Sequence, residues 1–188
     1  MMVVRHCLLF GLLIICVYTD LAHRKIYNWC TLPAIVVGLL LSYAMGGLWD
    51  GGWLGVNLGS AALALALVGV IFGWPYARGG IAAGDVKLIL AVGAIGGLHN
   101  AFTPYAVFYS ALIGALMAVL ALIWRGKLKE GLKGAVHFTF STQRLRASGE
   151  DELEEKKPSV SGVTVPYGLA IALGSVIAWY QVELLRAL

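Results

Sequence analysis

Residues 102–124 read FTPYAVFYSALIGALMAVLALIW, a run without a single charged side chain. A helix of this length, at about 1.5 Å per residue, covers the roughly 30 Å of hydrocarbon in a bilayer. Further apolar runs occur along the chain at residues 3–19, 31–48, 53–74, 86–98 and 164–185. All but the fourth run reach or approach the length of a transmembrane helix. The sequence therefore predicts an all-α fold, a polytopic integral membrane protein with about six transmembrane helices.

The composition of the 188-residue chain supports the same class. Apolar residues make up 60% and charged residues 13%, with a mean hydropathy of +0.82. Soluble domains contain roughly 45–50% apolar and about 25% charged residues. The formal net charge of +4 is compatible with nucleic acid, but the positive residues lie in loops, where membrane orientation explains them better. We therefore expect the lipid bilayer as the surroundings and no nucleic acid as a partner.

The three cysteines give no indication of a metal or redox site. Cys7, Cys16 and Cys30 form no C-x-x-C pair, which argues against a zinc ribbon and a thiol redox motif. All three lie in or beside apolar runs, where packing is the simplest role. No other pattern indicates a metal or an organic cofactor, and we expect none.

The distribution of Lys and Arg predicts the orientation in the membrane. Loops 20–30, 75–87 and 125–163 contain twelve of the 14 Lys and Arg residues, whereas the opposite side has only Arg5 and Arg186. Cytoplasmic loops carry the excess of positive residues in membrane proteins. We therefore expect these three loops in the cytoplasm and both termini outside.

The chain is short enough to form one membrane domain over residues 1–188, with a long cytoplasmic loop at 125–163. The loop begins with a basic, amphipathic stretch at 126–147, of a kind that lies on a membrane surface. An acidic linker follows at 148–161, a composition typical of a solvated tether. Two interpretations of the loop remain, a tether between two helices and a docking surface for a partner.

Two acidic residues stand out as functional candidates, because a charge near hydrocarbon is costly. Most Asp and Glu residues lie in the last cytoplasmic loop, Asp50 lies in a glycine-containing outer turn, and Glu183 lies near the outer end of the last run. Asp20 and Asp85 remain. The predicted orientation assigns both of them to the cytoplasmic side.

Helix lengths predict a similar depth for both carboxyls. The 19 residues from Arg5 to Arg24 span about 28 Å, so Asp20 lies about one turn inside the cytoplasmic boundary if these arginines mark the interfaces. The run at 86–98 is about 20 Å long, so its start beside Asp85 lies roughly 10 Å below that surface. Non-helical backbone before Asp85 is tolerated at this depth only when it is buried or lines a cavity. The sequence therefore predicts a water-accessible cleft.

Two aspartates in such a cleft are suited to peptide hydrolysis. They share one proton, the ionised carboxyl accepts a proton from water, and the other donates to the scissile carbonyl. The pair titrates as a unit, so neither Asp20 nor Asp85 is assigned a fixed role. Gly84 would let a substrate backbone approach closely. Structural alternatives remain: Asp85 as an N-cap and Asp20 as a partner of Arg24 one turn later.

Three segments resemble the type IV prepilin peptidases, a family of membrane aspartic peptidases. Gly84-Asp85-Val86-Lys87-Leu88 is similar to the G-x-G-D-V-K-L signature at the start of their fourth helix, with Ala82 in place of the first glycine. Residues 20–28 resemble the segment between the first two helices, with Tyr27 in place of a proline. Val165-Pro166-Tyr167-Gly168 resembles the Pro-aromatic-Gly start of the final helix.

This resemblance implies a membrane-embedded aspartic endopeptidase with catalytic Asp20 and Asp85. Its substrates would be prepilin-like precursors, type IV pilins or pseudopilins, which lose a basic leader peptide at the cytoplasmic face of a bacterial inner membrane. Without a tetracysteine cluster, the chain resembles the short form that lacks the methyltransferase domain. Gly84 and Lys87 are candidate neighbours of the substrate. In one interpretation, Lys87 affects the protonation of the two aspartates or contacts an acidic substrate side chain. In the other, it extends to the membrane interface.

Three other functions are considered. A small transporter or channel with an aspartate ion site would have acids near the midplane and repeated halves, and the sequence has neither. A non-enzymatic subunit of an export apparatus would use the loop at 125–163 and would not need Asp20 or Asp85. A presenilin-type protease also uses Gly-x-Gly-Asp, but we expect a longer chain and deeper aspartates for it.

Overall fold

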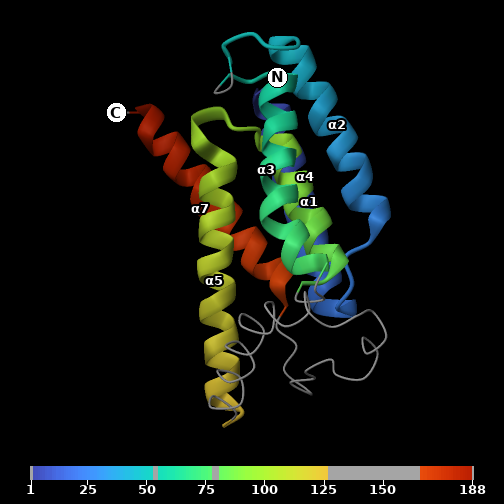
Figure 1. Ribbon diagram of the computed structural model, residues 1–188, viewed down its shortest axis with the longest axis vertical. Helices are drawn as coiled ribbons and strands as arrows, with labels where there is room; N and C mark the ends of the chain where they lie inside the picture. The colour runs from blue at the N-terminus through green and yellow to red at the C-terminus, as the bar shows by residue number, and fades with distance from the viewer. Residues whose placement is uncertain (1, 53–54, 78–80, 127–165, 188) are drawn as a thin grey trace, which may run out of the picture. The chain divides into compact units, whose positions relative to one another are not determined.

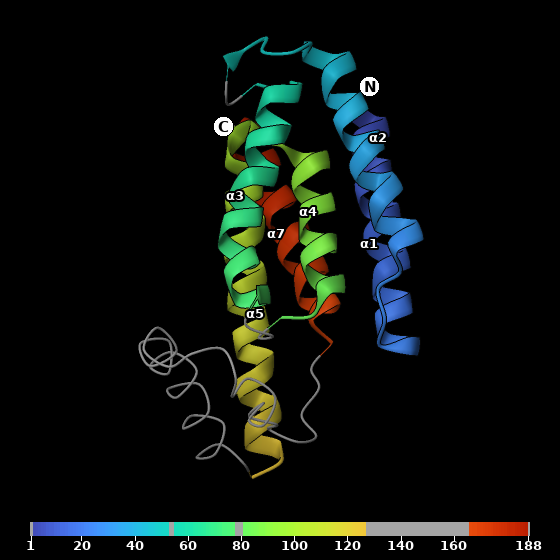
Figure 2. The same cartoon turned by 45° about the vertical axis from the view of Figure 1, so that its right-hand side comes forward.

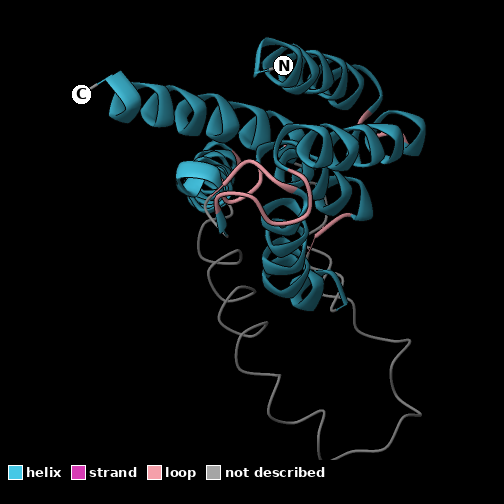
Figure 3. Cartoon of the chain, turned by 90° about the horizontal axis from the view of Figure 1, so that it is seen from above, coloured by secondary structure: helices cyan, strands magenta, loops and turns pink. Residues whose placement is uncertain are grey.

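The structure is a computed structural model that describes residues 2–52, 55–77, 81–126 and 166–187. Its elements are α1 (Met2–His23), α2 (Asn28–Gly46), α3 (Leu58–Ala77), α4 (Ala83–Gly96), the short 3-10 helix η2 (His99–Ala101), α5 (Phe102–Trp124) and α7 (Tyr167–Ala187). Within the described ranges there are helices and loops but no strand (Figure 3). The all-α prediction is therefore confirmed. The basic stretch and the acidic linker predicted within loop 125–163 lie outside the described residues.

The helix lengths agree with a polytopic membrane protein. Five segments in the described part of the chain are long and apolar enough to cross a bilayer: α1, α2, α3, α5 together with η2, and α7. The remaining helix, α4, has 14 residues and is about 21 Å long, which is shorter than the hydrocarbon layer. It corresponds to the apolar run that the sequence already shows to be short.

Contacts within the chain define two compact units. The first consists of Met1–Gly114 and Pro166–Leu188, and the second of Ala115–Val165. The first unit contains both candidate aspartates and all three motifs except Val165. A single domain over residues 1–188 stays a prediction.

Helix α4 is the buried centre of the first unit. It contacts α1, α2, α3 and α7, and Figure 2 shows it between α2 and α3. From Leu88 to Gly96 every residue except Leu90 is buried. A helix that is apolar on all sides is suited to this position, because protein rather than lipid surrounds it. The outer helices turn large apolar side chains outward instead, among them Val36, Leu40 and Val70.

Small residues let α2 approach α4 closely. A Cβ atom added at Gly38 of α2 would lie 2.9 Å from the Ile95 side chain and 3.0 Å from the Ala94 backbone. Helices in membranes pack by van der Waals contact, and small residues at the interface bring their backbones together. The approach fixes the position of α4, and therefore of Asp85 in its first turn, relative to α2.

The end of α1 lies with the starts of α2, α4 and α7 at one end of this unit, the lower end in Figures 1 and 2. Helix α1 ends there at His23, and α2, α4 and α7 begin there at Asn28, Ala83 and Tyr167. The three motifs of the sequence are therefore brought to the same end. This end carries Asp20 in the last turn of α1 and Asp85 in the first turn of α4.

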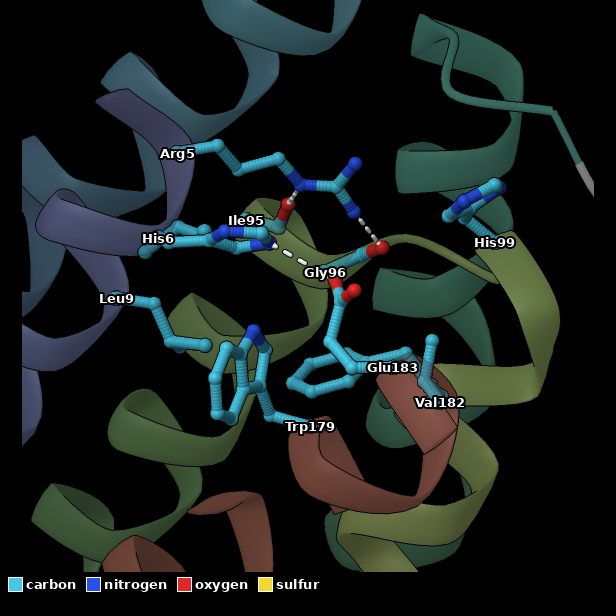
Figure 4. Close-up of a pocket in the computed structure, with 10 residues that line it drawn as sticks. Arg5, His6, Leu9, Ile95, Gly96, His99, Trp179, Val182 and Glu183 are labelled. Carbon is cyan, nitrogen blue, oxygen red and sulfur yellow. Dashed lines mark hydrogen bonds and ion pairs between the residues drawn. The ribbon is translucent and has the colours of Figure 1, made fainter. Parts of the chain in front are cut away.

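The opposite end of α4 contains a cavity between α1, α4, α7 and η2 (Figure 4). Arg5, which the depth estimate assumed to mark the membrane interface, is buried here with 6% of its surface exposed. Its guanidinium donates hydrogen bonds to the carbonyl oxygens of Ile95 and Gly96. These carbonyls belong to the last turn of α4 and have no partner within the helix. Arg5 therefore caps the C-terminus of α4, and its use as a marker of the membrane interface stays a prediction.

Candidate active site

Asp20 connects the end of α1 to the start of α7. Its side chain is buried, with 8% of the residue surface exposed, and its Oδ2 atom accepts a hydrogen bond from the N–H of Gly168 at 2.9 Å. The first N–H groups of a helix have no partner within it. A carboxylate at this position satisfies one of them, as an N-cap residue does, and lies at the positive end of the helix dipole.

Gly168 fits this contact because it has no side chain. A Cβ atom at this position would lie 2.7 Å from Oδ2 and 3.1 Å from Cγ of Asp20. Any larger residue would force the carboxylate away from the helix end. The sequence analysis identified Gly168 only as part of the motif that starts the final helix and assigned it no role. In the sequence, only the position of Gly168 directly after a Pro-aromatic pair indicates that this glycine matters.

Asp85 is the third residue of α4 and is half-buried. The N-cap of α4 is Ala82, without a side-chain capping hydrogen bond, so the alternative interpretation of Asp85 as the N-cap is wrong. Asp85 also lies outside the five helices that are long enough to span a membrane. The negative charge of Asp20 acts on the carboxyl of Asp85. The two carboxyls are therefore close enough to interact electrostatically.

Tyr167 lies beside the aspartates at the start of α7. The ring packs against Gly114 of α5, where a Cβ atom would overlap it. Tyr167 also interacts electrostatically with Asp85. Sequence reasoning treated the residue only as the aromatic member of a motif, because nothing local shows which helix it will face.

Gly84 brings the segment between α1 and α2 onto α4. A Cβ atom at Gly84 would lie 3.0 Å from Cβ of Ile26, so the described neighbour of Gly84 is a side chain of the protein. Room for a substrate backbone at this glycine stays a prediction. The contact joins the first motif to the second, since Ile26 lies between Asp20 and Asn28.

Lys87 makes a second connection between the same two motifs. Its Nζ donates a hydrogen bond to Oδ1 of Asn28 at 2.9 Å, in an exposed position. Asn28 is the first residue of α2. The structure thus adds a contact that neither interpretation of Lys87 had included.

Across residues 2–52, 55–77, 81–126 and 166–187, no three or more His, Cys, Asp or Glu side chains form a cluster suited to a metal ion. The described residues near Asp20 and Asp85 offer groups for proton transfer and hydrogen bonding, namely the two carboxyls, the Tyr167 hydroxyl and the backbone N–H of Gly168.

Comparison with known protein families gives one result. The model of the type IV leader peptidase family matches residues 7–119, which is more than half of the chain and includes both Asp20 and Asp85. Comparisons with curated proteins and with solved structures find no match. The match extends from α1 into α5 and includes the G-D-V-K-L motif. The chain therefore belongs to the type IV leader peptidase family.

Proposed function

We propose that the protein is a membrane-embedded aspartic endopeptidase that removes the basic leader peptide from prepilin-like precursors, type IV pilins or pseudopilins. Membership of the type IV leader peptidase family makes the protein a peptidase. The observation that supports an aspartic mechanism is the electrostatic coupling of Asp20 and Asp85, two carboxyls from different helices at one end of the unit. Paired carboxyls that share a proton can act together as acid and base.

The positions of the aspartates support an enzyme over a transporter. Asp20 lies in the last turn of α1, and Asp85 lies in the first turn of α4. An ion pathway through the membrane would favour acids near the middle of the helices. Carboxyls at helix ends can instead receive a water molecule and a peptide from the aqueous side.

The proposed site faces the cytoplasm of a bacterial inner membrane. Twelve of the 14 Lys and Arg residues fall in the segments 20–30, 75–87 and 125–163, and segments rich in Lys and Arg between membrane helices are cytoplasmic as a rule. A precursor whose basic leader stays in the cytoplasm would present its cleavage site there. Both termini of the peptidase would then be outside.

The test is cleavage of a purified prepilin-like precursor by the protein in detergent. Wild type is compared with Asp20→Asn and Asp85→Asn, which keep the size of each side chain, and with Asp50→Asn as a matched control in an exposed turn. We expect Asp20→Asn and Asp85→Asn each to lower kcat by about a hundredfold or more, and we expect Asp50→Asn to cleave normally. Normal cleavage by either dyad variant would disprove the aspartic mechanism. Failure of the wild type to cleave would show that the substrate class is wrong.

A further inference from the structure

The two carboxyls of the candidate dyad have different surroundings. Asp20 is buried and accepts the N–H of Gly168. Asp85 receives no hydrogen bond from any residue in the described part of the chain, and it is half-buried beside the negative charge of Asp20. Buried carboxyls without hydrogen bonds are more stable in the protonated form, whereas an N–H donor stabilises the ionised form.

The N–H group that donates to Asp20 lies at the positive end of a helix dipole, which favours a negative charge on the Asp20 carboxyl. Gly168 is the second residue of α7, a 21-residue helix whose N-terminus carries a partial positive charge. A backbone N–H that donates to a carboxylate makes a stronger hydrogen bond than one that donates to a neutral acceptor. The missing Cβ of Gly168 is what permits the approach, since it would lie 2.7 Å from Oδ2.

We propose that Gly168 is a positioning residue that holds Asp20 as the carboxylate, so that Asp20 is the general base and Asp85 the general acid of the reaction. This inference rests on the proposed peptidase function. It assigns each aspartate a role that the sequence leaves open, and it connects the start of the final helix to the chemistry.

Other groups around the pair are compatible with this assignment. Asp20 faces Asp85 from α4 and the thiol of Cys16 one turn earlier on α1, and Arg24 lies one turn later. Asp85 faces Asp20 and the hydroxyl of Tyr167 from α7. Arg24 also favours a charged Asp20, so the experiment separates its contribution from that of Gly168.

The assignment gives a balanced reaction. Asp20 accepts a proton from water while the water oxygen bonds to the scissile carbonyl carbon, and Asp85 gives its proton to the carbonyl oxygen. When the C–N bond breaks, the proton on Asp20 moves to the leaving amine. Asp85 recovers a proton from a hydroxyl of the intermediate, and the carboxylic acid product is formed. Both aspartates return to their starting states.

The first experiment is the pH profile of kcat/KM for three variants. In Gly168→Ala the new Cβ displaces the Asp20 carboxylate, so we expect a lower kcat and an acidic limb about one pH unit higher than in wild type. Gly174→Ala, on the same helix as Gly168, is the matched control, because its Cβ would clash with Ser110 of α5 without touching Asp20. It should lower thermal stability but leave the acidic limb in place. Arg24→Gln should move the limb less than Gly168→Ala does.

The second experiment does not depend on activity. The infrared band of the protonated carboxyl is followed against pH in Asp85→Asn and in Asp20→Asn, each as a difference from the double variant, so that each spectrum reports one aspartate. We expect the single remaining Asp20 to titrate at a lower pH than the single remaining Asp85. The addition of Gly168→Ala to Asp85→Asn should raise the midpoint of Asp20.

Two results would overturn the inference. One is a titration order in which Asp85 loses its proton first, and the other is an acidic limb unchanged by Gly168→Ala. If both single Asn variants are inactive in either case, only the assignment of roles fails. If a single Asn variant still cleaves the precursor, the proposed function fails instead.

Discussion

At the scale of single residues, Asp85 determines the pH dependence that we expect of the enzyme. Its half-buried carboxyl lies beside the negative charge of Asp20, and in the proposed reaction it starts in the protonated form. As the pH increases, Asp85 loses the proton that it would donate to the scissile carbonyl. We therefore predict that kcat falls on the alkaline side of its pH profile. Precursor cleavage measured across a series of buffers tests this, and a rate that keeps rising as the buffers become alkaline contradicts it.

The residue scale also shows what the sequence can and cannot predict about the site. Asp20 and Asp85 can be found from the sequence because they are the acids left near apolar runs once the loops are set aside, and a family motif surrounds each of them. The partner of Asp20 cannot be found in this way. Gly168 lies 148 residues further along the chain, and its role depends on a close approach of two helices that no local pattern encodes.

At the scale of helices, the hydrogen bond from Lys87 to Asn28 connects the start of α4 to the start of α2. Exposed polar contacts contribute about 0–1 kcal/mol, so Lys87→Met and Asn28→Ala should both have small effects on thermal stability. If the contact only joins the helices, the two variants should also have equal, minor effects on cleavage. A larger rise in KM or fall in kcat for Lys87→Met alone would show that Lys87 acts on the substrate or on the aspartates.

The buried end of α4 is expected to matter more for stability than this exposed contact. Arg5 donates to the carbonyl oxygens of Ile95 and Gly96, as Figure 4 shows. Arg5→Gln would leave at least one buried carbonyl without a partner, and we predict a loss of about 2 kcal/mol in the free energy of unfolding. Denaturation in detergent measures this. Arg125→Gln, at an exposed arginine, is the control and should change stability little, and equal effects of both variants would argue against the capping role.

Helix boundaries illustrate why hydropathy predicts elements better than their ends. The apolar run at 53–74 predicts a helix that starts several residues earlier than α3, which begins at Leu58. Asn57 explains the difference, because its Oδ1 accepts the N–H of Ser60 at 2.7 Å while its Nδ2 donates to the carbonyl oxygens of Asp50 and Gly52. The side chain thus caps α3 and closes the preceding turn. A hydropathy average counts the apolar residues of that turn but not this polar cap.

At the scale of the whole molecule, α4 decides how the chain crosses the membrane. The described part of the chain has five helices long enough to span, and α4 adds a sixth that is short but surrounded by α1, α2, α3 and α7. Irregular or short segments at membrane depth are tolerated when protein encloses them. With α4 counted as a crossing, the start of α1 and the end of α7 lie on the same side. Without it, an odd number of crossings would separate the described ends of the chain.

The side of the membrane on which the C-terminus lies tests the topology and the proposed location of the site together. Because twelve of the 14 Lys and Arg residues fall in the segments 20–30, 75–87 and 125–163, we predict that the C-terminus is outside and that these segments are cytoplasmic. A phosphatase that is active only outside, fused to the C-terminus, should be active in cells, and a green fluorescent protein at the same position should be dark. The same reporters inserted in the loop at 125–163 should give the reverse. Fluorescence at the C-terminus would mean either that α4 does not cross the membrane or that the aspartates open to the other side, where a leader held in the cytoplasm could not reach them.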